Sequence, residues 1–288
     1  SLMNYADIKL GTWYPQGGMY EVVKAMQQLA GTLGVKFEFG QEVEQLEIEN
    51  GKVRKVITAA GEFEADVVIG AADYHFIESR LLPAGSRSYN ETYWDNRVMA
   101  PSCLIYYIGI NKKLNNVLHH NLFFDTDFGQ HGKEIYTTKE WPADPLFYVC
   151  APSVTDSTVA PAGHENLFFL VPVAAGLEGD TEALRDKYFE KLLDRFEART
   201  GEQIRQSIVF KRSYSVSDFV HDYNAFKGNA YGLANTLTQT AILKPSLKSK
   251  KIKNLYYTGQ LTVPGPGVPP SLISGEVVAR EIIKEFKP

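Results

Sequence analysis

The sequence predicts an α/β fold of the α+β kind, in which α/β segments at both ends flank a β-rich insertion. Helical and strand patterns alternate over residues 13–82 and return over residues 236–288. Between them, residues 83–235 consist mainly of long β-rich segments. A chain that resumes its first pattern after a different one is typical of a domain that carries an inserted second domain. We therefore expect three segments with these boundaries.

The N-terminal segment begins with a turn and a helix. Pro15-Gln-Gly-Gly-Met19 is a turn signal, and the apolar residues of 19–33 recur at the i, i+3, i+4 and i+7 spacing of one buried helix face. Val35, Phe37 and Phe39 then alternate with polar residues, which predicts a strand.

A hairpin and a buried strand follow the helix. Asn50-Gly51 separates two strand patterns, 43–48 and 53–58, and this dipeptide is the strongest short hairpin signal. A third strand begins after Gly61. Residues 65–72 are apolar on both faces, which predicts a strand in the middle of a parallel sheet covered by helices.

The insertion and the C-terminal return complete the expected elements. Four long β-rich segments and one clear helix, 181–198, lie in the insertion; the β-rich segments are 102–110, 146–152, 166–173 and 208–214. The return consists of a strand over 254–259 and a closing helix over 271–286.

Composition and charge exclude several classes of protein. The 288 residues are 44% apolar with a net charge of −4, so there is no overall basic field and we expect no nucleic acid partner. The longest apolar run, 167–177, contains Pro172 and is shorter than the roughly 18 to 20 residues of a membrane span. Cys103 and Cys150 stand far apart in sequence and outside any C-x-x-C motif, which indicates buried thiols of a reducing compartment such as the cytoplasm; a single disulfide is the alternative. No signal peptide is visible.

The segment 256–275 is the most informative part of the chain. An apolar strand runs into a Gly/Pro-rich turn, in which Gly259, Gly265 and Gly267 permit close approach of the backbone to a ligand. The N–H groups of the following helix, starting near Pro269-Pro270, would point at whatever is bound there. The order predicts an anion or dipole site, and the alternative is an ordinary connection between a strand and a helix.

Four motifs in order resemble one family, the phytoene desaturase type of carotenoid dehydrogenases, which are FAD enzymes related to amine oxidases. The resemblance covers nearly the whole chain, and the second and fourth motifs are the most specific. The motifs are Tyr14-Pro-Gln-Gly-Gly-Met19, then Pro152-Ser-Val-Thr-Asp156 continuing to Pro172, then 219–233 with Lys244-Pro245, and the segment 256–275.

The resemblance implies a partial FAD-binding, Rossmann-like domain of the glutathione reductase type with an inserted β-rich substrate domain. Members of the family begin with a Gly-x-Gly-x-x-Gly turn for the FAD pyrophosphate, and these 288 residues contain no such fingerprint. We therefore expect the C-terminal part of a longer enzyme, inactive by itself and binding FAD weakly or not at all. A short natural homologue is the alternative.

The resemblance also assigns residues to the cofactor. Backbone near Val43 would pass the adenine, although a plain hairpin core residue is an equal interpretation. Gly259 would let the chain pass the pyrophosphate or ribityl chain, with Gln260 as a ribityl or phosphate contact. Close approach at Gly267 would bring Val268, Pro269 and the first helical N–H groups to the pyrimidine edge of the flavin, where the positive helix end stabilises negative charge.

The activity implied is desaturation of a long isoprenoid, such as phytoene or a carotenoid, by hydride transfer to the flavin. Electrons would pass on to oxygen or a quinone, and the catalytic base stays unassigned. One alternative is a flavin amine oxidase or a retinoid or lipid oxidoreductase. Another, for the isolated chain, is a non-catalytic scaffold that binds a hydrophobic ligand.

Two further groups of residues have a functional and a structural interpretation. Asp218, His221 and Asp222 could form a proton relay, but such a cluster is more often a solvated turn. A basic run could contact an anionic membrane surface as a peripheral protein, but is more often a solvated loop; it consists of Lys244, Lys248, Lys250, Lys251 and Lys253.

The histidines and aromatic residues complete the candidates. The histidines lack metal-ligand spacing, so we expect no metal; they are His75, His119, His120, His131 and His164. The insertion is dense in aromatic residues that suit a long apolar substrate, and about half of them should be core; they are Tyr106, Tyr107, Phe123, Phe124, Phe147, Tyr148, Phe168 and Phe169.

Overall fold

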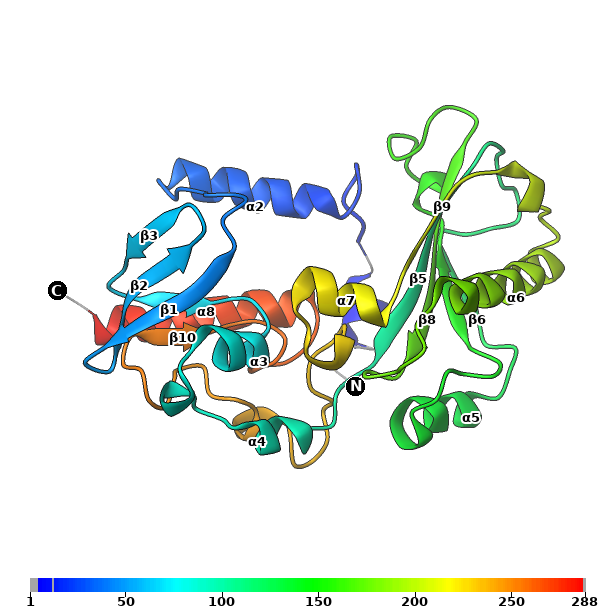
Figure 1. Ribbon diagram of the computed structural model, residues 1–288. Coiled ribbons are helices and arrows are strands. Elements are labelled where there is room, and N and C mark those ends of the chain that lie inside the picture. The colour runs from blue at the N-terminus through cyan, green and yellow to red at the C-terminus, as the bar shows by residue number, and fades with distance from the viewer. Residues whose placement is uncertain (1–4, 12, 287–288) are drawn as a thin grey trace.

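The computed structural model describes residues 5–11 and 13–286. Two sheet-containing parts lie side by side, with helix α7 (Val216–Tyr223) between them in the view of Figure 1. One part contains the two small sheets, and the other contains a five-stranded sheet. This arrangement agrees with the mixed α/β fold that the sequence predicts.

Helix α2 (Tyr20–Thr32) forms where the apolar spacing predicts it, after a turn in which Gly18 N–H donates to the Pro15 carbonyl. The prediction that one face would be buried is wrong, because the helix has no buried residue. The predicted strand at 35–39 is also wrong. No described segment pairs with it, and Phe37 and Phe39 stack on each other at 6.0 Å.

The predicted hairpin is confirmed. Strands β1 (Val43–Glu49) and β2 (Lys52–Thr58) pair antiparallel, and β3 (Gly61–Glu64) joins β2 on its other side. Asn50 and Gly51 have φ values of 51° and 72°, the left-handed conformation that a two-residue hairpin turn requires.

The second small sheet pairs segments from opposite ends of the chain. Strand β4 (Val68–Gly70) runs parallel to β10 (Leu255–Tyr257), which confirms a parallel strand within 65–72. The predicted position in the middle of a sheet is wrong, because among the described residues this sheet has only these two strands. The expected cover on both faces of β4 is wrong, since Ile69 is 48% exposed. Helix α8 (Val268–Glu285) begins three residues before the predicted Ser271, because proline is compatible with the first turn of a helix.

The five-stranded sheet confirms the β-rich interpretation of the insertion. Its strand order is β6-β7-β8-β5-β9, all antiparallel. The strands are β5 (Ser102–Ile110), β6 (His120–Phe123), β7 (Phe147–Cys150), β8 (Glu165–Val173) and β9 (Ile208–Tyr214). Helix α6 (Glu182–Thr200) begins at the Thr181 N-cap and ends at Gly201, which has a φ of 75°.

The main core lies between this sheet and α6. Leu192, Leu193 and Phe196 of the helix are fully buried, and the Phe196 ring lies 5.3 Å from that of Phe169 on β8. The aromatic residues divide as expected. Tyr106, Phe123, Phe147 and Phe169 belong to the core, whereas Tyr107 and Phe124 are exposed.

Several short elements had no predictive pattern. The short α-helices are α3 (Tyr74–Phe76), α4 (Glu91–Asp95) and α5 (Phe128–Lys133). Single turns of π or 3-10 type cover Ala6–Leu10, Ile77–Leu81, Ala84–Ser86, Glu134–Thr138, Pro152–Val154, Arg205–Ser207, Phe226–Gly228 and Ala241–Leu243. Within residues 5–11 and 13–286, no helix has both the length and the hydropathy needed to cross a membrane.

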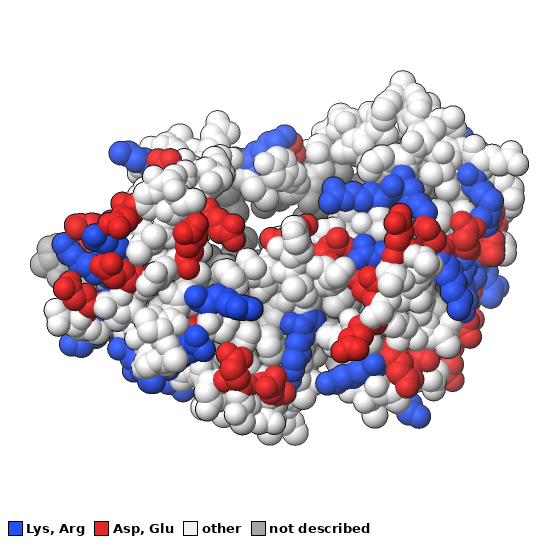
Figure 2. All heavy atoms as spheres, viewed as in Figure 1, with Lys and Arg blue, Asp and Glu red and all other residues white. Residues whose placement is uncertain are grey.

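Charged side chains of both signs are mixed over the face shown in Figure 2. On the β1–β3 sheet they pair across strands, with Lys55 2.6 Å from Glu62 and Arg54 3.1 Å from Glu64. No continuous basic stripe crosses this face.

Candidate functional site

A cavity of about 630 Å³ lies where the two parts of the molecule meet. It is bounded by the end of β4, by α7 and the segment after it, and by the turn between β10 and α8. A volume of this size is typical of small-molecule and cofactor sites. The lining residues are Ala71, Ala72, Asp73, Phe219, Tyr223, Ala225, Asn229, Ala230, Tyr231, Thr258, Gly259, Gln260, Leu261, Gly267, Val268, Ser271 and Leu272.

The glycine after β10 opens one wall of the cavity. Gly259 has a φ of 109°, and a Cβ placed there would meet no atom within 4 Å. Its N–H donates to the Oγ of buried Ser274 at 2.9 Å, and Thr258 Oγ1 lies 2.6 Å from the same oxygen. Ser274 therefore fixes the turn against α8 while the opposite side of Gly259 stays open.

The start of α8 faces the cavity with the positive end of its helix dipole but offers few backbone N–H groups as hydrogen-bond donors. Gly267 is its N-cap with a φ of 106°, and Val268 is the first helical residue. Pro269 and Pro270 carry no N–H, and the Ser271 N–H already donates to the Gly267 carbonyl at 3.0 Å. The expectation of several N–H groups aimed at a ligand is therefore wrong, because only the Val268 N–H is available in this turn. The positive end of the helix dipole remains.

A second wall is built by close contact between two backbone segments. A Cβ on Gly232, whose φ is 74°, would lie 2.7 Å from the Gln260 carbonyl oxygen, so only glycine fits there. The Oδ1 atom of buried Asn229 accepts the Gly232 N–H at 2.7 Å and the Gln260 side-chain amide at 3.1 Å. Asn229 therefore positions Gln260 at the cavity wall.

Asp73 carries the only carboxylate among the described residues that line the cavity. Its oxygens accept the backbone N–H groups of Phe76 at 3.0 Å and Phe226 at 3.1 Å. Burial raises the pKa of Asp73, and these two hydrogen bonds oppose that rise. Asp73 is the N-cap of α3 and connects that helix to the segment after α7.

A buried lysine lies behind the turn between β10 and α8. Lys244 is 5% exposed, and its Nζ has no hydrogen-bond partner among the described residues. A Cβ added to Gly265 would lie 3.6 Å from this Nζ and 3.7 Å from Asn235 Oδ1. Burial lowers the pKa of Lys244. An unpaired ammonium group in this position fits an electron-rich or anionic group bound beside the turn.

Of the other four members of the basic run, Lys250, Lys251 and Lys253 are exposed, as in a solvated segment, and three of the four contact a neighbouring residue individually. Lys248 pairs with Glu285. The Lys250 Nζ lies 4.1 Å from the centre of the Tyr89 ring, and the Lys251 Nζ donates to the Gly85 carbonyl at 3.0 Å.

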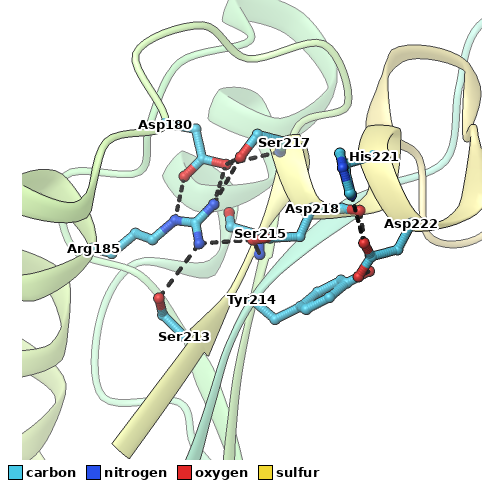
Figure 3. A network of polar contacts seen from close by, with 9 residues as sticks. All are labelled: Asp180, Arg185, Ser213, Tyr214, Ser215, Ser217, Asp218, His221 and Asp222. Carbon is cyan, nitrogen blue, oxygen red and sulfur yellow. Dashed lines mark hydrogen bonds and ion pairs between the residues drawn. The ribbon is translucent and has the colours of Figure 1, made fainter.

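Helix α7 separates an apolar face from a polar one. Phe219 and Tyr223 line the cavity. On the polar side, Arg185 of α6 contacts both oxygens of Asp180 at 2.7 Å and one oxygen of Asp218 at 2.7 Å. Figure 3 shows this network, which anchors α7 to the five-stranded part.

The predicted relay residues are divided among structural roles rather than gathered at the cavity. Asp218 closes a capping box with Ser215 at the start of α7. His221 has an 88% exposed side chain, and its hydrogen bond to Asp222 raises its pKa. Asp222 also accepts the Tyr214 hydroxyl at 3.0 Å. None of the three lines the cavity.

The predicted cofactor residues separate into two groups. Gly259, Gln260, Gly267 and Val268 come together on the cavity wall. Pro269 lies in the exposed first turn of α8, outside the lining. Val43 lies at the start of β1, packed against the smaller core and also outside the lining. Sequence patterns assigned no role to Asn229 or Ser274, and they placed Lys244 in a motif and in a basic run without indicating its burial at this turn. Each of the three acts on a segment distant in sequence.

Comparison with known proteins points to one family. The sequence profile described as flavin-containing amine oxidoreductase matches residues 1–283. The carotenoid 3,4-desaturase of Haloarcula japonica is 41% identical over 286 residues, covering 99% of this chain and 58% of its own length. The zeta-carotene-forming phytoene desaturase of Myxococcus xanthus is 31% identical, covering 98% of this chain and 54% of its own length. The chain thus spans somewhat more than half the length of these relatives.

Solved structures show the same fold at low sequence identity. An oxidoreductase from Methanosarcina mazei superposes with a TM-score of 0.63 at 16% identity, covering 92% of this chain and 55% of its own. Cyclohexylamine oxidase from Brevibacterium oxydans superposes with a TM-score of 0.57 at 12% identity, covering 94% of this chain and 53% of its own.

Proposed function

The chain belongs to the family of flavin-containing amine oxidoreductases, and from that premise we propose that its cavity holds the ring system of FAD in an enzyme that desaturates a long isoprenoid. The observation that carries the proposal is the joint position of Gly259, Gln260, Gly267 and Val268 on one cavity wall. Relatives that are named carotenoid and phytoene desaturases support the substrate class.

The residues present fit a flavin ring. Gly259 leaves open space where any other residue would place a side chain, and the first turn of α8 offers one N–H and a positive dipole. The ammonium group of Lys244, buried behind the same turn, adds a positive charge that has no partner among the described residues. Both features would stabilise negative charge on an electron-rich ring edge.

The opposite side of the cavity suits an apolar chain. Phe219 and Tyr223 of α7 and nearby Tyr231 present aromatic rings to it. FAD, when bound, would supply the hydride acceptor for the desaturation. The protein would contribute orientation of the substrate against the ring and exclusion of water. Val43 near the adenine and Pro269 near the ring remain part of the proposal.

The domain organisation of the proposal follows the sequence. Residues 13–82 and 236–288 would form part of an FAD-binding domain of the glutathione reductase type, and residues 83–235 the substrate domain. The pairing of β4 with β10, 185 or more residues apart in sequence, supports a domain assembled from both ends of the chain.

The test is a titration of the chain with FAD, in which quenching of flavin fluorescence reports binding. Because the pyrophosphate fingerprint is not in this chain, we expect weak but measurable binding, and Gly267→Val should weaken it at least tenfold further because a branched side chain at a φ of 106° displaces the backbone at the start of α8. Gly179→Val is the matched control, since Gly179 also has a positive φ, of 74°, and does not line the cavity.

Equal FAD affinity in Gly267→Val and in the unmodified chain would show that this turn is not at the ring. A chain that binds no FAD would leave a scaffold that holds a hydrophobic ligand. The substrate class is tested separately by titration with a C40 polyene, in which quenching of tyrosine fluorescence reports binding. Tyr223→Ala should weaken that binding and leave FAD affinity unchanged.

The proposal also includes the electron acceptor, the cellular location and contact with a membrane. Oxygen or a quinone would accept the electrons, and the protein would work in the cytoplasm with peripheral contact to a membrane. The exposed apolar residues of α2, among them Val23, Met26 and Leu29, support such contact better than the lysine run does. Flotation with anionic lipid vesicles tests it, and protein that stays at the bottom of the gradient would contradict it.

A further inference from the structure

Two histidines and a cysteine meet at the edge of the five-stranded sheet. His120 begins the edge strand β6 and lies directly opposite Cys150, the last residue of β7. His119 precedes the strand, and its carbonyl accepts the Ala151 N–H at 2.8 Å. One ligand atom from each of the three side chains lies within 4.8 Å of the other two. Residues that face each other across an antiparallel pair project to the same side, which explains the proximity of His120 and Cys150.

Hydrogen bonds orient both imidazole rings. The Nδ1 atom of His119 lies 2.6 Å from the Thr155 hydroxyl, and the Nδ1 atom of His120 lies 2.6 Å from the Tyr148 hydroxyl. Each ring therefore has its second nitrogen, Nε2, left over. Histidines that bind metals are usually held in this way, with the nitrogen that does not bind the metal engaged by a neighbouring group.

One of these nitrogens lacks a partner. His119 Nε2 is buried and forms no hydrogen bond with any described residue. A buried polar atom without a partner costs free energy, so it needs a specific explanation. Cys150 is a free, half-buried thiol. An unsatisfied imidazole nitrogen beside a free thiol is a donor set suited to a metal of borderline softness.

We propose that His119, His120 and Cys150 form a binding site for Zn²⁺. Two imidazole nitrogens and a thiolate provide three of the four ligands of a tetrahedral zinc ion, and water completes the set. The ligand atoms of such a site lie about 3.5 Å apart, so the trio must contract slightly on binding. His120 is exposed, which leaves room for a small shift of its ring. The thiol proton of Cys150 is released to solvent when the S–Zn bond forms.

This site is independent of the proposed flavin function, since none of its three residues lines the cavity. It departs from the sequence-based expectation of no metal, which rested on the spacing of the histidines alone. Pairing of β6 with β7 brings Cys150 beside two residues that precede it by about 30 positions. Linear spacing does not reveal a site assembled in this way.

Titration of the chain with Co²⁺ in place of Zn²⁺ tests the proposal. We expect one equivalent to produce a thiolate-to-cobalt charge-transfer band in the near ultraviolet and tetrahedral d–d bands in the visible. Cys150→Ser should lose the charge-transfer band. A cobalt complex without that band, or a band that persists in Cys150→Ser, would overturn the assignment.

Zinc affinity, measured by competition with a chromogenic chelator, gives a second measurement. His120→Gln, at an exposed position that tolerates substitution, should weaken Zn²⁺ binding at least tenfold. His164→Gln is the matched control, because His164 lies outside the trio and should leave the affinity unchanged. Equal affinity in His120→Gln and the unmodified chain would show that the trio is only a hydrogen-bonded cluster.

Discussion

The five-stranded part and the part around β4 and β10 differ in how far they bury their own apolar residues. In the first, α6 packs on the sheet with Leu192 and Phe196 fully buried. In the second, α2 has a comparable apolar spacing and no buried residue, with Val23 52% and Leu29 62% exposed. A sequence pattern thus identifies the apolar face of a helix, but whether that face is buried depends on whether a second element packs on it.

The cavity lies on the boundary between these two parts, and its walls come from both. Phe219 and Tyr223 belong to α7, which the Arg185 network anchors to the five-stranded part, while Gly259 and Val268 belong to the other. The site therefore combines a wall from the well-packed part with a wall from the part in which α2 has no buried residue. The shape of the cavity should therefore depend on how firmly the two parts of the molecule are held together.

The largest expected effect contrasts a core phenylalanine with an exposed leucine. Phe196→Ala should lower the free energy of unfolding by about 3–5 kcal/mol, because it leaves a cavity between α6 and the sheet. Leu29→Ala in α2 should change it by less than about 0.5 kcal/mol. Urea unfolding followed by circular dichroism measures both. A loss of more than 2 kcal/mol in Leu29→Ala would show that α2 is covered in solution.

The next effect tests the join between the two parts. Arg185→Met removes the partner of Asp180, whose side chain is only 5% exposed, and should cost roughly 3 kcal/mol. Arg185→Lys keeps the charge but loses the forked contact to Asp180 and Asp218, so it should recover only part of that loss. Equal unfolding midpoints for Arg185→Met and the unmodified chain would mean that the network does not hold α7 in place.

The contrast between the well-packed part and the part with exposed α2 explains which elements of the fold could be predicted from the sequence. Strands β5, β8 and β9, helix α6 and the Asn50-Gly51 hairpin were predictable because their partners lie within the same part of the chain. The strand expected at 35–39 and the buried face of α2 failed for the opposite reason. Their patterns are those of packed elements, but no described element packs on them.

The candidate site was predictable only along one segment. Gly259 and Gly267 were visible because a turn that needs positive φ favours glycine whatever lies around it. The role of Asn229 and the burial of Lys244 were not predictable, since an amide or an ammonium group acquires its role from segments that only the fold brings near. Proline chemistry also limited the interpretation of α8, whose first turn offers fewer N–H groups than a helix N-terminus normally does.

A moderate effect concerns pH and a buried histidine of the five-stranded part. His131 donates from Nε2 to the Pro172 carbonyl at 2.9 Å and accepts the Leu146 N–H at Nδ1. Burial lowers its pKa. The unfolded chain takes up a proton at this imidazole near pH of about 6.5, above the pH at which the folded chain does. Acid should therefore reduce stability as the pH falls below that value.

Urea midpoints at several pH values between neutral and mildly acidic conditions measure this effect, with His131→Gln expected to show a flatter dependence. Exposed His221 serves as the comparison within the same chain, because its contact with Asp222 raises its pKa. In an NMR titration His221 should titrate above His131. The reverse order would contradict the burial of His131.

The smallest effect tests whether the outer face of α8 is open to solvent. Glu276 and Arg280 form an ion pair one turn apart, with side chains 58% and 71% exposed, and the order of acid before base is the favourable one in a helix. Arg280→Ala should lower the free energy of unfolding by only about 0.3–0.5 kcal/mol, and added salt should remove that difference by screening. The measurement is urea unfolding of both proteins at low and high salt. A salt-independent loss above about 1 kcal/mol would mean that this outer face of α8 is covered in solution.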